Sequence, residues 1–143
     1  MADDVIAPPY DVINSQEAYE LAKDRPNSFL HISKPEIDLD ESTPYNDPKV
    51  YQKGRENLDR MIKDGVLIED SEDMLYLYEM IDGEIHQLGI AALGSLEAYE
   101  NGRIKRHEFT KPDKELDRVN NISSLNAQTG PVLLTYLDDE DLS

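Results

Sequence analysis

The pattern of hydrophobic and polar positions predicts one long helix and one β-hairpin. The segment 48–64 places its apolar residues at helical spacing, with Asp47 suited to cap its start and Gly65 suited to end it. The segment 74–93 consists instead of two apolar runs around Asp82-Gly83, a dipeptide typical of tight hairpin turns. We therefore predict a helix over 48–64 and an antiparallel hairpin over 74–93.

Shorter patterns predict further helices and strands. Asn14 followed by Glu17 matches a capping box before a helix. Ser95 is suited to begin a short helix, and the spacing of Thr110 to Asp113 resembles another helix cap. We therefore predict helices over 15–23, from Ser95 towards Gly102, and over 111–123. We also predict strands over 28–33 ("SFLHIS") and 131–137 ("PVLLTYL").

The order of these elements predicts the fold class. Helices and antiparallel strands follow each other without a regular strand-helix order, which is typical of the α+β class. We expect a small mixed sheet with a central β-hairpin and about four helices. No internal repeat or low-complexity linker divides the chain, so we predict one α+β domain over 1–137 and an acidic tail over 138–143.

Composition restricts the chemistry and the partners of this chain. Its 143 residues include 31 Asp and Glu against 14 Lys and Arg, a formal net charge of −17, and no cysteine. Disulfides, thiolate metal sites and cysteine nucleophiles are therefore excluded. The negative charge repels nucleic acids and anionic lipid, so we predict neither nucleic acid nor membrane as a partner. We find no apolar segment of membrane-spanning length and no signal-peptide pattern, and we predict a cytoplasmic protein.

Positive residues gather in one stretch, 101–118. Six of the 14 Lys and Arg residues lie there against four acidic residues, which gives this stretch a net charge of +2. If Thr110 caps the helix that follows, unpaired backbone N–H groups and the positive end of the helix dipole meet at this place. We therefore predict a phosphate site held by Lys105, Arg106, Thr110 and Lys111. The alternative is an ordinary solvated helix start with local ion pairs.

Acid-base groups accompany the basic residues. A carboxylate near concentrated positive charge stays ionised, so Glu108 is a candidate general base, with His107 as a second proton carrier. Asp11 lies in the proline-stiffened segment "PPYDVI", which either presents its side chain to a site or forms a rigid entry into the first helix. The histidines do not match a zinc-protease motif, and we interpret the acidic residues of 36–41 as a solvated loop, so we predict no metal site.

Six motifs, taken in order, resemble one known family. They are "APPYDVI", "NSFLHISKPEIDL", "YNDPKVYQKGRENLDRMIKDGVL", "LYLYEM", "IKRHEFTKPDKELDR" and "TGPVLLTY". Over nearly its whole length the chain resembles the bacterial and archaeal conserved proteins catalogued as domain of unknown function 1015. Typical members are longer, so the resemblance implies an N-terminal part whose partner is the missing remainder of a longer protein.

The resemblance also implies a fold and a function. The family is similar to ParB/sulfiredoxin-like proteins, a small α+β fold whose members bind nucleotides or transfer phosphate, including free serine kinases. Genes of the family often lie near those for serine biosynthesis, which implies a link to serine metabolism. With Asp11 as a further partner, the positions that match the phosphate-handling segment are Lys105, Arg106, His107, Glu108 and Thr110.

Three functions are compatible with these patterns. The first is a phosphate-handling enzyme or ligand-binding domain for a small phosphorylated metabolite or nucleotide, in which Lys105 and Arg106 hold the phosphate and Glu108 takes a proton. The second is a winged-helix DNA-binding module built from 48–64 and 74–93, which the acidic residues of both segments oppose. The third is a non-catalytic interaction module. The sequence does not identify a cofactor.

Overall fold

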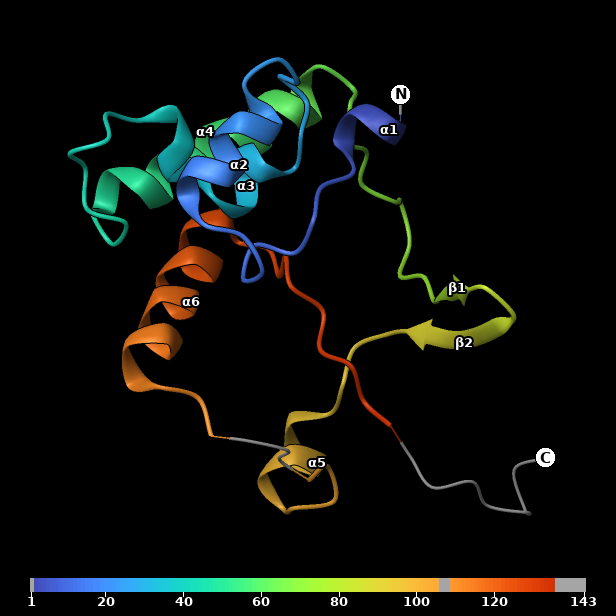
Figure 1. Ribbon diagram of the computed structural model, residues 1–143. Helices are drawn as coiled ribbons and strands as arrows, with labels where there is room; N and C mark the ends of the chain where they lie inside the picture. Colours follow the sequence, from blue (N-terminus) through green and yellow to red (C-terminus); the bar gives the residue numbers. More distant parts are fainter. Residues whose placement is uncertain (1, 106–108, 136–143) are drawn as a thin grey trace.

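The computed structural model describes residues 2–105 and 109–135 (Figure 1). Its elements, in chain order, are α1 (Ala2–Val5), α2 (Ser15–Ala22), α3 (Leu30–Ser33), the 3-10 helix η1 (Pro35–Asp38), α4 (Pro48–Lys63), β1 (Tyr76–Asp82), β2 (Ile85–Ala91), α5 (Leu96–Glu100) and α6 (Pro112–Leu125). Helices combined with a two-stranded antiparallel sheet confirm the α+β class and the hairpin. The described part has six α-helices where about four were expected, and none of them is long and apolar enough to cross a membrane.

The hydrophobic core lies among the helices. Helix α4 packs against α3, η1 and α6, and α2 packs against α3 and η1. Figure 1 shows α2, α3 and α4 bundled together, with α6 running down from this bundle. Six of the buried hydrophobic side chains form two clusters, one of Ala18, Ala22 and Leu30 and one of Ile32, Met61 and Leu125. Because α3 contributes to both clusters, it joins the α2 side of the core to the α4–α6 side.

Helix α4 confirms the prediction for 48–64. The Asp47 side chain accepts a hydrogen bond from the Lys49 N–H at 2.9 Å, and Pro48 occupies the first turn, where no intrahelical N–H bond is lost. Gly65 follows the helix with φ +69°, a conformation that glycine adopts without strain. The residues that α4 buries are Val50, Tyr51, Gly54 and Met61, which lie along one side of the helix.

Gly54 allows α4 to lie close to the α3–η1 turn. A Cβ atom at this position would lie 3.2 Å from the Pro35 Cγ and 3.4 Å from the Ile32 carbonyl oxygen. The first distance is shorter than an ordinary van der Waals contact between carbon atoms. The absence of a side chain therefore lets the α4 backbone lie close to Ile32 and Pro35.

The predicted caps of the two short helices also form. Asn14 accepts a hydrogen bond from the Glu17 N–H at 2.9 Å, and the Glu17 carboxylate accepts one from the Asn14 N–H at 2.8 Å. This reciprocal pair is the predicted capping box, and it starts α2 at Ser15. The Ser95 hydroxyl accepts from the Ala98 N–H at 3.1 Å and starts α5 in the same way.

The hairpin prediction is confirmed, with a small shift of its turn. Strand β1 pairs with β2 from Tyr76 opposite Ala91 to Asp82 opposite Ile85, so the two-residue loop is Gly83-Glu84. Only the glycine has positive φ, at +60°, which is the pattern of a type II′ turn. The turn lies one residue later than the predicted Asp82-Gly83 centre, and every residue of both strands is exposed.

The strand predicted over 28–33 is wrong. Leu30–Ser33 form the single turn of α3, in which the Ser33 N–H donates to the Phe29 carbonyl and the Lys34 N–H to the Leu30 carbonyl. The alternation that suggested a strand does appear in burial, because residues 28, 30 and 32 are buried. A strand would need a neighbouring strand to satisfy its backbone, whereas the N–H groups of residues 31–34 bond to carbonyls of residues 28–30.

The strand predicted over 131–137 is wrong for its described residues. Residues 131–135 have no regular secondary structure and are exposed, and 136–137 lie outside the described residues, as does the predicted acidic tail 138–143. The described sheet is therefore a purely antiparallel pair rather than a mixed sheet. An apolar run predicts a strand only where another strand supplies hydrogen bonds, and none lies beside this segment among the described residues.

Candidate functional site

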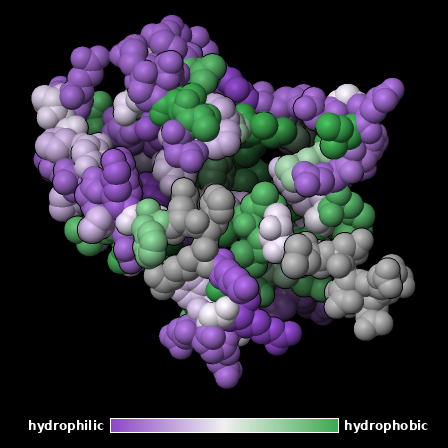
Figure 2. Space-filling view, turned by 60° about the horizontal axis from the view of Figure 1, so that its bottom comes forward, coloured by the Kyte–Doolittle hydropathy of each residue, from purple (hydrophilic) through white to green (hydrophobic). Residues whose placement is uncertain are grey.

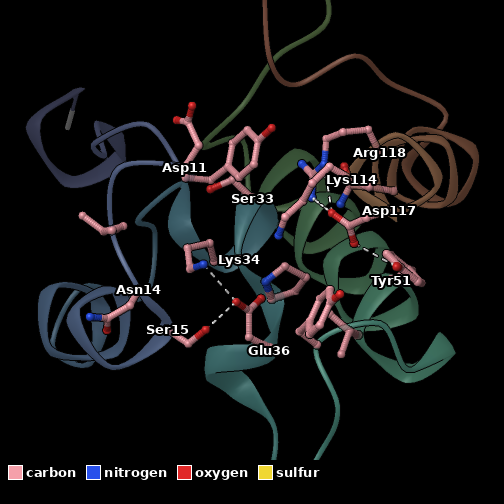
Figure 3. A pocket seen from close by; sticks show the side chains of 16 residues that line it. Asp11, Asn14, Ser15, Ser33, Lys34, Glu36, Tyr51, Lys114, Asp117 and Arg118 are labelled. Carbon is pink, nitrogen blue, oxygen red and sulfur yellow. Dashed lines mark hydrogen bonds and ion pairs between the residues drawn. The ribbon is translucent and has the colours of Figure 1, made fainter. Parts of the chain in front are cut away.

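A pocket of 570 Å³ lies between five segments of the helical part. These segments are the N-terminal loop, the start of α2, the α3–η1 turn, the start of α4 with the loop before it, and α6 (Figure 3). The lining residues used below are Tyr10, Asp11, Ser15, Lys34, Glu36, Tyr45, Tyr51, Lys114, Asp117, Arg118 and Asn121. The volume is in the range of pockets that bind small molecules.

One wall is a polar group formed by Ser15, Lys34 and Glu36. The Ser15 hydroxyl donates a hydrogen bond to the Glu36 carboxylate at 2.8 Å, and the Lys34 ammonium lies 3.1 Å from the same oxygen. The lysine and glutamate side chains are only 14% and 16% exposed, so this ion pair is shielded from bulk water. Figure 3 shows the two bonds meeting at Glu36 and tying the start of α2 to the α3–η1 turn.

The opposite wall is a second polar group, formed by Tyr51, Asp117 and Arg118 (Figure 3). The Tyr51 hydroxyl donates to Asp117 at 2.9 Å, and Arg118 donates to the other carboxylate oxygen from Nε at 3.1 Å and Nη2 at 2.6 Å. Burial raises the pKa of Tyr51, and the bond to Asp117 acts in the same direction, so the hydroxyl remains a donor. The Arg118 guanidinium lies 4.2 Å from the Tyr10 ring centroid, which fixes its plane.

Two further polar groups of α6 line the pocket without strong partners among the described residues. The Lys114 ammonium lies 5.4 Å from the Tyr45 ring centroid and forms no ion pair there. The Asn121 side chain is 2% exposed, and its Oδ1 has no hydrogen-bond partner in the described part of the chain. A buried acceptor without a donor costs free energy, so a donor that reaches this oxygen would stabilise the pocket.

The charges of the lining are balanced but not all paired. Lys34 is paired with Glu36 and Arg118 with Asp117, which leaves Lys114 and Asp11 as the lining charges without an ion pair among the described residues. An unpaired ammonium beside an oriented guanidinium can bind an anion, and a separate carboxylate can accept a proton or a hydrogen bond. The pocket therefore combines anion-binding and proton-accepting groups in one volume.

The comparison with known proteins identifies the family. All residues of the chain, 1–143, match the family model described as Protein of unknown function (DUF1015). The chain belongs to the DUF1015 family. No curated protein and no solved structure matches it, so the suggested ParB/sulfiredoxin-like fold of this DUF1015 member is not confirmed.

The DUF1015 chain places one predicted site residue at the pocket. Asp11 belongs to the lining, and Figure 3 shows its carboxylate at the rim, pointing away from Lys34 and Glu36. Among the described residues no group of three or more His, Cys, Asp and Glu side chains could hold a metal ion. The predicted catalytic role of Asp11 remains a prediction.

Thr110 does not cap the helix of the basic stretch, which corrects the prediction. Helix α6 begins at Pro112 with Lys111 as its N-cap residue, and in the described part of the chain no side-chain cap hydrogen bond forms there. The residue before a proline is held in extended backbone, as Lys111 is at ψ 138°, and the proline itself favours the first helical position. These two preferences start the helix one residue later than the Thr110 to Asp113 spacing suggested.

The described ones among the remaining predicted residues of this DUF1015 chain lie outside the pocket lining. Lys105 and Lys111 are exposed and do not belong to the pocket lining. Arg106, His107 and Glu108 lie outside the described residues. Their proposed roles in holding phosphate and transferring protons therefore remain predictions.

The sequence placed Lys114 near the predicted phosphate site but did not indicate Arg118 or Lys34 as pocket residues. Lys114 and Arg118 were counted in the basic stretch, and their spacing of four residues places them on one face of α6, which is a signal that could have found them. Lys34 lies far away in the chain, and its approach to α6 depends on the packing of α4 against both segments. No local pattern indicates that approach.

Proposed function

We propose that the pocket binds a small phosphorylated metabolite or a nucleotide. The observation that carries the proposal is Lys114, which lines the pocket without an ion pair among the described residues and lies one helical turn from Arg118. A phosphate group gains most from cations that are already positioned and are not neutralised by a carboxylate. Lys114 is not neutralised by a carboxylate among the described residues, and Arg118 is already positioned.

Arg118 supports this proposal through its bonding pattern. Its Nε and Nη2 groups donate to Asp117, whereas Nη1 has no acceptor among the described residues. The guanidinium is held on one side by Asp117 and stacked on Tyr10, so its orientation is set before a ligand arrives. Lys34, which is paired with Glu36, adds positive charge on the opposite wall.

The proposed ligand class includes phosphoserine, because the family resemblance implies a link to serine metabolism. Phosphoserine carries an ammonium group besides its phosphate, and the Asp11 carboxylate at the rim has the charge to attract it. If the chain is a phosphate-handling enzyme, Asp11 is also the lining carboxylate that is not engaged in an ion pair among the described residues. Phosphoserine and ADP are therefore the first ligands to test.

Calorimetric titration of the chain with phosphoserine, ADP and unphosphorylated serine tests the proposal. We expect heat of binding for at least one phosphorylated ligand and a much weaker signal for serine. The Lys114→Gln variant is expected to lower the affinity about 10- to 100-fold, because it removes a charge-assisted bond worth roughly 1.5–3 kcal/mol.

Lys111→Gln is the matched control, because it removes the same charge from the start of the same helix but outside the pocket lining. We expect its affinity to stay within about twofold of the unchanged chain, since exposed charges contribute little. Loss of binding in Lys111→Gln together with normal binding in Lys114→Gln would place the phosphate at the exposed helix start instead. Equal affinities in all three proteins would refute the pocket as the site.

A further inference from the structure

The hairpin exposes hydrophobic side chains on both of its faces. Directly opposed residues of an antiparallel pair share a face, so the register assigns Leu77, Ile81, Leu88 and Ile90 to one face. These four side chains are 61–76% exposed. The other face has Tyr76, Tyr78, Met80 and Ile85, which are 39–67% exposed. Such a concentration of exposed apolar residues is typical of an interaction surface.

No described element covers this surface. Strands β1 and β2 contact each other and no other helix or strand in the described part of the chain. Figure 1 shows the hairpin standing to one side of the helical bundle, and Figure 2 shows hydrophobic residues gathered around a hollow on one face of the molecule. A two-stranded hairpin is marginally stable alone, and each of its strands has one edge with free backbone groups.

The charge around the hairpin indicates what kind of partner fits it. We define the acidic arm as residues 68–102, which include no Lys or Arg. Its acidic residues are Glu69, Asp70, Glu72, Asp73, Glu79, Asp82, Glu84, Glu97 and Glu100. A second copy of the arm would bring the same charges together, and like charges at an interface oppose association. A partner with Lys or Arg beside its apolar residues would be attracted instead.

We propose that the acidic arm binds an extended protein segment in which apolar residues alternate with Lys or Arg. The segment adds to a free edge of the hairpin through backbone hydrogen bonds, which is a known mode of peptide recognition. Its apolar side chains extend the face of Leu77 and Ile90, and its cations lie near the carboxylates of the arm. This function is independent of the pocket, because the hairpin does not contact the helices that form it.

Fluorescence anisotropy with two labelled nine-residue peptides tests the proposal. One peptide alternates valine with lysine, and the other alternates valine with glutamate. We expect the lysine peptide to bind and its affinity to fall as salt is added, because screening weakens attraction between charges, while the glutamate peptide does not bind. Absence of binding by the lysine peptide, or equal binding by both, would overturn the proposal.

Variants of the chain locate the binding. Leu77→Ser/Ile90→Ser should abolish binding of the lysine peptide, while the helical circular dichroism stays unchanged because these side chains do not pack on the helices. Asp82→Asn/Glu84→Gln should weaken binding about fivefold or more, through loss of complementary charge. The matched control is Asp24→Asn/Glu41→Gln, which removes two exposed charges from the helical part and should change the affinity less than about twofold.

Two results would contradict this assignment. Equal weakening by the control and the arm variants would show that the peptide is attracted by the net charge of the chain rather than by the arm. Sedimentation that shows a dimer, and a monomer for Leu77→Ser/Ile90→Ser, would identify the occupant of the hairpin as a second copy.

Discussion

The helical bundle and the acidic arm differ in where their hydrophobic residues lie. All eight buried hydrophobic residues of the described chain belong to the helical part, from Ala18 in α2 to Leu125 in α6. The hairpin strands have none, although their sequences are more apolar than that of α4. Hydrophobicity therefore predicts burial only when another element is available to pack against.

The two regions also differ in the pattern of their polar residues. Helix α4 has one buried side, and its remaining surface is charged and solvated. It therefore needs neighbours to pack against on one side only. The hairpin is apolar on both faces and therefore needs a layer on each side, as sheets inside larger folds do. Stability should accordingly be concentrated in the bundle, and three predictions test this difference.

The largest effect is expected for Met61→Ala. Met61 is fully buried between Ile32 and Leu125, so its truncation leaves a cavity and should lower the free energy of unfolding by about 2–5 kcal/mol. The matched change in the arm is Leu77→Ala, at a side chain that is 76% exposed. It should change the free energy of unfolding by no more than about 0.5 kcal/mol. Urea unfolding followed by circular dichroism measures both. Similar losses in the two variants would show that the hairpin belongs to the cooperative core.

A smaller loss is expected for Gly54→Val. The new side chain would enter the 3.2 Å space to Pro35 and push α4 away from the α3–η1 turn, which should cost roughly 1–3 kcal/mol by overpacking. Gly89→Val in β2 is the control, because the contact that a Cβ would make there, with the Tyr78 carbonyl oxygen, is an ordinary 3.8 Å. Thermal melts of both variants should show a lower melting temperature for the first alone. An unchanged melting temperature for Gly54→Val would mean that the two backbones are not closely packed.

The smallest effect concerns a histidine in the bundle. The His31 Nδ1 lies 2.8 Å from an Asp38 carboxylate oxygen, and its Nε2 lies 3.1 Å from the Arg25 carbonyl oxygen. Two acceptors suit the doubly protonated ring, and the hydrogen bond to Asp38 raises the pKa of His31 above 6.5. Burial opposes ionisation of Asp38, but the interactions with His31, Asn57 and Lys53 together outweigh burial and lower the pKa of Asp38 below 3.8.

The sign of the pH dependence follows from these two directions. His31 contributes stability fully below pH 6.5 and loses it as the pH rises through its raised pKa, whereas Asp38 contributes above pH 3.8 and loses it as the pH falls. The pair should stabilise the bundle most between these values. We expect the urea midpoint to decrease as the pH is raised from 5.5 to 8.5 (about the range of histidine titration). The decrease should be smaller in His31→Gln. His86→Gln, which changes an exposed histidine of the hairpin, should retain the full dependence; an unchanged dependence in His31→Gln would contradict the assignment.

The candidate site was predictable only in part. The basic residues of 101–118 indicated an anion site, and Asp11 was a candidate, yet the pocket lining includes Lys114 from the first turn of α6 and Arg118 one turn later rather than Lys105, Thr110 and Lys111. Lys34 was not anticipated, because the contact between the α3–η1 turn and α4 that brings it near α6 joins segments distant in the sequence. Local spacing can indicate which residues share a helix face but not which distant segment faces them.

The sequence by itself determined the local structure with strong signals. Local structure of this kind includes the helix caps at Asn14, Asp47 and Ser95 and the turn at Gly83. Each depends on side chains or backbone freedom within a few residues, so it forms without contacts to distant parts of the chain. Only the tertiary structure decided that 28–33 is a helical turn, that 131–135 is not a strand, and that the hairpin lies outside the core. A strand and a buried face both require partners that are distant in the chain, and a local pattern does not specify whether those partners are present.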